Sequence, residues 1–113
     1  MVSDYKIVFY TDKSGSCPIT EFLDSCSDSL RSKILRQFMY VCEFGISYRI
    51  PNIKKVAGTN FWELRILGKD NIRVFCIGNK RDVHIIQIFN KKKQKTPLNE
   101  IRTAESRIHH LDF

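Results

Sequence analysis

Three apolar segments separated by two short turns constrain the fold of this chain more than any other sequence feature. The segments span residues 61–66, 72–77 and 83–89, and each is rich in aromatic or β-branched side chains, which favour β-strands. The connecting segments, 67–71 and 78–82, contain glycine, asparagine and aspartate. Connections this short join antiparallel neighbours. The second half of the chain is therefore predicted to form an antiparallel meander.

The first half shows a different pattern, that of one strand followed by two helices. Residues 5–10 have the composition of a strand. Pro18 suits the first position of a short helix over roughly 18–25, where its missing N–H costs nothing. Residues 28–44 repeat apolar side chains every three or four positions, which predicts a helix with one buried face. Gly45 is placed to end that helix.

A last helix is predicted after the meander. Thr96 is placed to cap it, and Pro97 would occupy its first position. The following residues to 111 carry one narrow apolar stripe, so this helix is expected to pack on a single surface. The pattern predicts one α+β domain over residues 1–113, in which an N-terminal strand and a helical hairpin pack on an antiparallel sheet.

Composition places the chain among folded globular proteins. Of its 113 residues, 42% are hydrophobic and 27% are charged, which argues against disorder. No apolar stretch approaches the roughly 18 residues of a membrane span, and no signal-peptide pattern follows Met1, so a cytoplasmic location is expected. The four cysteines form no C-x-x-C pair. Cys42 and Cys76 are interpreted as small buried side chains in a reducing compartment.

The positive charge of the chain is concentrated in its second half. The net charge is +7, and residues 52–113 hold thirteen of the 19 basic residues but only six of the 12 acidic ones. Residues 1–51 are neutral overall. A one-sided positive field favours a polyanion such as nucleic acid, although a basic surface that serves only solubility stays an alternative.

The candidate functional residues are basic. His84, His109 and His110 form neither a metal-binding pattern nor a nucleophile–histidine pattern. By contrast, a hairpin about residues 67–71 would bring Arg65 and Arg73 together, and a run of lysines follows the third strand. Such cations stabilise the extra negative charge of a phosphodiester in its transition state.

Each of these basic groups also has a structural interpretation. The two arginines could pair across strands with Glu63 or Asp70. The lysine run could be a solvated loop that binds RNA without taking part in chemistry.

The basic residues fall within motifs that resemble the phage-derived, HigB-like branch of the RelE/ParE superfamily, the toxins of type II toxin–antitoxin systems. Residues 54–65 (KKVAGTNFWELR) resemble the segment that leads into the sheet in that family. Residues 71–75 (NIRVF) resemble its next strand, and 89–97 (FNKKKQKTP) its lysine-rich signature. Glu100, Ala104 and Arg107 fit the helix that follows. The first 50 residues match in layout more than in motif.

The resemblance implies a RelE-like fold with a curved antiparallel sheet, and an endoribonuclease that cuts mRNA on the ribosome without a metal or other cofactor. The RNA 2′-hydroxyl would attack the neighbouring phosphate. The implied catalytic residues are Arg65, Arg73, Lys91 and Lys92. The implied RNA-binding residues are Lys54, Lys55, Lys93 and Lys95. No tyrosine follows Lys91, so a mechanism that uses a C-terminal tyrosine is not available, and the general base is unassigned.

The resemblance also implies partners. These are a cognate antitoxin of helix-turn-helix type, the ribosome and mRNA, with no membrane and no small-molecule cofactor. Two other functions stay open at this point. One is a ParE-like toxin that binds gyrase and has no nuclease activity. The other is a non-catalytic RNA-binding module, although the sequence lacks the aromatic stacking motifs of common RNA-binding domains.

Overall fold

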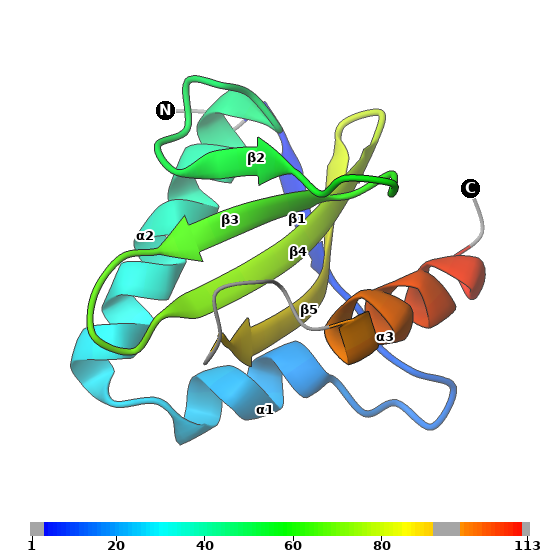
Figure 1. Ribbon diagram of the computed structural model, residues 1–113, viewed down its shortest axis with the longest axis horizontal. Helices are drawn as coiled ribbons and strands as arrows, with labels where there is room; N and C mark the ends of the chain where they lie inside the picture. Colours follow the sequence, from blue (N-terminus) through cyan, green and yellow to red (C-terminus); the bar gives the residue numbers. More distant parts are fainter. Residues whose placement is uncertain (1–3, 92–97, 112–113) are drawn as a thin grey trace.

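A computed structural model describes residues 4–91 and 98–111, and these residues form a five-stranded sheet with helices on both faces (Figure 1). Figure 1 shows α2 behind the sheet and α3 in front of it. The elements are β1 (Lys6–Phe9), α1 (Pro18–Ser25), α2 (Asp28–Phe44), β2 (Ile53–Lys55), β3 (Trp62–Ile66), β4 (Ile72–Asn79), β5 (Asp82–Asn90) and α3 (Leu98–His109).

The sheet has the strand order β1-β5-β4-β3-β2. The predicted meander is confirmed, because β3, β4 and β5 pair antiparallel, and β2 extends the same pattern at one edge. The N-terminal strand β1 forms the other edge and pairs parallel with β5. Parallel pairing needs a long crossover, which the two N-terminal helices contribute to. The predicted α+β fold is therefore present, and its sheet is mixed.

The first two helices bury the main core on one face of the sheet. From α2, the side chains of Ile34, Phe38 and Val41 pack into this core, and Ser27 caps the helix by accepting a hydrogen bond from the Leu30 N–H at 3.2 Å. Cys76 is also buried there, whereas Cys42 is only partly buried. Burial raises the pKa of the Cys76 thiol to about 12. No helix in the described ranges is long and apolar enough to cross a membrane.

Gly45 ends α2 as predicted, and two features of the structure favour glycine at this position. Its φ is 68°, in the left-handed region that disfavours side chains. A Cβ atom added there would lie 2.6 Å from Cζ of the Tyr5 ring. The N–H of Gly45 donates to the Val41 carbonyl at 2.8 Å. The end of α2 is thus packed tightly against the segment that leads into β1.

The opposite face of the sheet carries a second, smaller core under α3. Its aromatic centre is a row in which Phe75 contacts Phe61 (centroids 5.0 Å apart) and Phe89 (5.1 Å). Ala104 of α3 is fully buried against this core, as the predicted stripe requires, whereas Leu98 at the start of the helix is exposed. The predicted cap, Thr96 with Pro97, lies outside the described residues.

Candidate active site

The pairing of β3 with β4 places basic side chains on the face of the sheet that α3 partly covers. Arg65 and Arg73 are direct cross-strand partners, and directly paired residues project their side chains to the same face. Arg65 is exposed, whereas Arg73 is only 4% exposed. Its Nη1 donates to the Ile72 carbonyl at 3.2 Å. The two arginines therefore adjoin, and only Arg65 is open to a ligand.

A fully buried carboxylate, Glu63, lies beside these arginines. Its Oε1 is 3.7 Å from Nε of Arg73, and its Oε2 is 3.7 Å from Nζ of Lys54, whose side chain is 58% exposed. Lys54 is the cross-strand partner of Glu63 on β2. The alternative that Glu63 pairs with Arg73 is thus realised in the structure, but inside the protein rather than on its surface.

Lys91 completes this group at the end of β5. Its N–H donates to the Asn71 carbonyl at 2.9 Å, and the Asn71 side-chain amide donates to the Lys91 carbonyl. The side chain is buried, and burial lowers the pKa of Lys91. Arg73, Lys54 and Arg65 lower this pKa further, while Glu63 opposes them. We call Glu63, Lys54, Arg65, Arg73 and Lys91 the Glu63 cluster.

The other predicted residues are not in this cluster. Lys55 is adjacent to Lys54, but successive residues of a strand point to opposite faces. Its ammonium lies 5.5 Å from the ring centroid of Trp62, its partner on β3. Lys92, Lys93 and Lys95 lie outside the described residues. The sequence motif did not indicate that Glu63 would be the buried centre of the site, since burial depends on the packing of α3 and β2.

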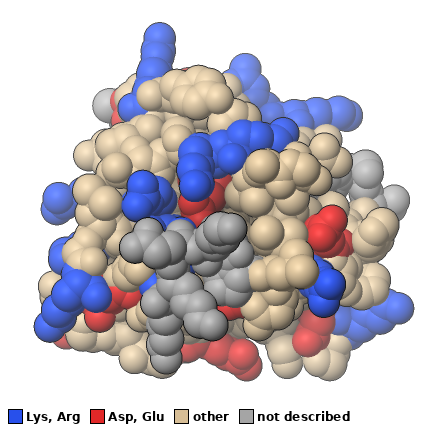
Figure 2. All heavy atoms as spheres, in the orientation of Figure 1, with Lys and Arg blue, Asp and Glu red and all other residues tan. Residues whose placement is uncertain are grey.

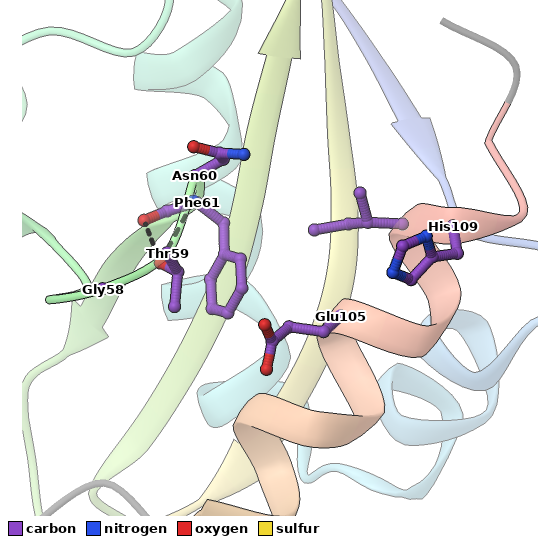
Figure 3. A pocket seen from close by; sticks show the side chains of 7 residues that line it. Gly58, Thr59, Asn60, Phe61, Glu105 and His109 are labelled. Atoms are coloured by element: carbon purple, nitrogen blue, oxygen red, sulfur yellow. Dashed lines mark hydrogen bonds between the residues drawn. The ribbon is translucent and has the colours of Figure 1, made fainter.

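Two hollows lie between the segment after Lys54 and α3. One, of about 250 Å³, is lined by residues 54–57 and Ile101. The other, of about 290 Å³, is lined by residues 58–61 and, from α3, by Glu105, Ile108 and His109. Figure 3 shows the Glu105 carboxylate and the His109 ring projecting from α3 on the side that faces Phe61. The first hollow is therefore lined by basic side chains, and the second by a carboxylate and an imidazole.

These residues can bind phosphate groups and, in the case of Lys91, release a proton. In Figure 2, Lys and Arg side chains gather over β2, and a small area of acidic atoms is visible beside them. Exposed Arg65 and Lys54 can bind phosphate oxygens, and a lysine with a lowered pKa gives up its proton more readily than a normal lysine. In the described parts of the chain, no three His, Cys, Asp or Glu side chains lie together in a way that could hold a metal ion.

The architecture defines the class of protein as one with the RelE fold. A double mutant of the Escherichia coli toxin RelE, solved in the free state, aligns with a TM-score of 0.64 over 93% of this chain and 98% of that chain, at 17% identity. The chain belongs to the phage derived protein Gp49-like family (DUF891), whose model matches residues 21–109. None of the curated proteins matches it. The expected RelE-like fold is confirmed, whereas the HigB-like branch stays a prediction.

Proposed function

We propose that this chain is the toxin of a toxin–antitoxin system and an endoribonuclease that cuts mRNA on the ribosome without a metal, thereby inhibiting translation. The observation that carries the proposal is the Glu63 cluster, in which Lys54 and Arg73 each lie 3.7 Å from one buried carboxylate, and Lys91 and Arg65 lie nearby on the same partly open sheet face. The RelE fold and the Gp49-like family support it.

In the proposed reaction the RNA cleaves itself under the influence of these cations. The 2′-hydroxyl oxygen bonds to the adjacent phosphorus, the bond from phosphorus to the 5′-oxygen breaks, and a proton goes to that 5′-oxygen. Arg65 would bind the non-bridging oxygens, and Arg73, which is buried beside Arg65, would add positive charge near the phosphate. Lys91 would supply the proton, since its pKa is lowered. Lys54 would hold the RNA strand, and Lys92, Lys93 and Lys95 would add cations. The base that accepts the 2′-hydroxyl proton is not assigned.

Cleavage of mRNA by purified components tests this proposal. Wild-type protein should cut mRNA bound to ribosomes, with EDTA present, and mapping of 5′ ends should locate the cuts. Arg65→Ala should slow cleavage about 100-fold or more, because one preorganised charge on a transition state is typically worth that much. Arg36→Ala removes an equal charge from the exposed side of α2 and should leave the rate within about twofold.

Intact mRNA under all conditions would refute the nuclease. Inhibition of gyrase with intact mRNA would instead support the ParE-like alternative, and RNA binding without cleavage would support a non-catalytic module.

We also propose a cognate antitoxin of helix-turn-helix type as the partner. Expression of the chain alone should then arrest bacterial growth, whereas expression of the Arg65→Ala variant should not.

A further inference from the structure

Tyr48, in the segment between α2 and β2, is an exposed aromatic residue that the proposed catalytic steps do not use. Its side chain is 79% exposed. The backbone on either side of it is ordered by a turn, in which the Ile50 N–H donates to the Ser47 carbonyl at 3.0 Å. Ile50 itself is buried in the main core. The segment thus presents an aromatic ring to solvent from a fixed position.

Trp62 on β3 supports this ring. The two ring centroids are 5.6 Å apart and the ring planes meet at 74°, so the rings pack edge to face. Trp62 is partly buried against the main core. Because Tyr48 makes this contact and still keeps most of its surface in solvent, a flat ligand can stack on it.

One cation lies over Trp62, and another belongs to the residue that follows Tyr48. Lys55 lies over Trp62 at 5.5 Å, and the Arg49 guanidinium lies 5.8 Å from the centroid of the Phe44 ring. Between Glu43 and Glu63 the sequence has no acidic residue, and Glu63 is fully buried. The charged side chains of residues 44–62 are therefore all basic.

We propose that Tyr48 is a stacking platform for a nucleobase of single-stranded RNA, with Lys55 and Arg49 binding the flanking phosphates. Proteins that bind single strands combine aromatic rings with cations in this way, because every base has a flat π face. The choice of RNA as the ligand rests on the proposed function. We call Tyr48, Trp62, Lys55 and Arg49 the Tyr48 platform.

The edge strand β2 connects the platform with the Glu63 cluster. Lys54 reaches Glu63 on the α3 face, while its neighbour Lys55 reaches Trp62 on the other face. Among the described strands, none pairs with the outer edge of β2. A strand of RNA that crosses this edge would contact both sites, so the platform would extend the bound RNA beyond the cleaved phosphate.

Binding of short oligonucleotides tests the platform separately from cleavage. Oligodeoxynucleotides lack the 2′-hydroxyl and cannot be cut by the proposed reaction, and Trp62 is the only tryptophan of the chain. Titration with a single-stranded oligodeoxythymidine should quench Trp62 fluorescence. Tyr48→Leu should weaken binding at least about fivefold and reduce the quenching, as loss of one stacked base predicts. Tyr48→Phe keeps the ring and should stay within about twofold.

An abasic oligonucleotide of equal length and charge separates stacking from electrostatics. It should bind wild type and Tyr48→Leu equally. Met39→Leu, at another exposed apolar position on α2, should bind the base-containing strand like wild type. Equal affinity of wild type and Tyr48→Leu for that strand, with both proteins folded by circular dichroism, would overturn the platform. Should mRNA stay intact while binding depends on Tyr48, the nuclease proposal fails and the platform stands.

Discussion

At the scale of single residues, the informative triplet is Glu63-Leu64-Arg65. Alternation along β3 sends Leu64 into the main core and places Glu63 and Arg65 on the opposite face. Glu63 is buried there between Lys54 and Arg73, while Arg65 stays exposed. One strand therefore supplies core packing, a buried counter-charge and an exposed cation in three successive positions.

Replacement of Glu63 by alanine should destabilise the fold. The change leaves Arg73 buried without the carboxylate 3.7 Å away, and breaking a buried pair typically costs about 3–5 kcal/mol. Urea unfolding should show this loss. Glu105→Ala, at an exposed carboxylate of α3, serves as the control and should change stability by less than about 0.5 kcal/mol. A loss as small as the control's would contradict the role of Glu63.

The lowered pKa of Lys91 predicts that the stability of the fold depends on pH in a specific way. Its pKa in the folded state is lowered, mainly by burial, so in the window just below the usual lysine pKa the unfolded chain binds more protons. The contribution of Lys91 to the free energy of unfolding should therefore rise as pH increases through that window. Lys91→Met should be more stable than wild type at neutral pH, and the difference should shrink towards about pH 10.5. A difference that is constant with pH, measured by urea unfolding, would contradict this.

At the scale of elements, two contacts add to the apolar cores in positioning the helices on the sheet. The end of α2 meets the ring of Tyr5 at Gly45. On the other face, Arg107 of α3 donates to the Ile86 carbonyl at 2.8 Å and to Gln87 Oε1 at 2.9 Å. Gln87 in turn donates to Glu100 at 3.0 Å. The position of α3, and with it the hollow beside Lys54, therefore depends on polar contacts with β5 in addition to the apolar ones.

The substitution Gly45→Ala should destabilise the protein by more than about 1 kcal/mol, because it combines an unfavourable φ with a steric clash. Gly58→Ala is a matched control, since Gly58 has a φ of 76° but no atom within 4 Å of its added Cβ. Thermal unfolding of the two variants isolates the clash with Tyr5. Equal losses would show that backbone strain alone accounts for the effect.

At the scale of the whole molecule, several of the basic residues from the second half of the chain lie close together around β2 and β3. Arg65 and Lys54 lie on one face of the sheet near the edge strand β2, and Lys55 lies on the other face of the same strand. A polyanion bound there releases counterions in proportion to the phosphates it places against these cations. The position of the basic surface is thus decided by strand order rather than by composition.

The salt dependence of RNA binding should show whether RNA contacts these basic residues. For single strands, each phosphate contact contributes about 0.7 to the slope of log K against log salt. Arg65→Ala should reduce the magnitude of that slope by about this amount, measured by fluorescence anisotropy with a non-cleavable strand. Arg36→Ala on α2 should leave the slope unchanged. Equal slopes for wild type and Arg65→Ala would place the RNA elsewhere.

The helices and most strands could be predicted from the sequence, because hydrophobic periodicity and capping residues are local. The predicted helix over 28–44 matches α2 (Asp28–Phe44), and the predicted hairpin does bring Arg65 opposite Arg73. The sequence also shows that the excess of positive charge lies in the half of the chain that contains β2–β5 and α3.

The parallel pairing of β1 with β5, the burial of Glu63 and the contact of Lys55 with Trp62 depend on tertiary packing, so the sequence could not predict them. Local patterns show that a strand has two faces, but not which face α3 will cover. Burial and charge proximity arise from contacts between residues far apart in the chain. For that reason most cations of the candidate site could be predicted from the sequence. The burial of Glu63 among them, and their arrangement, became visible only in the folded structure.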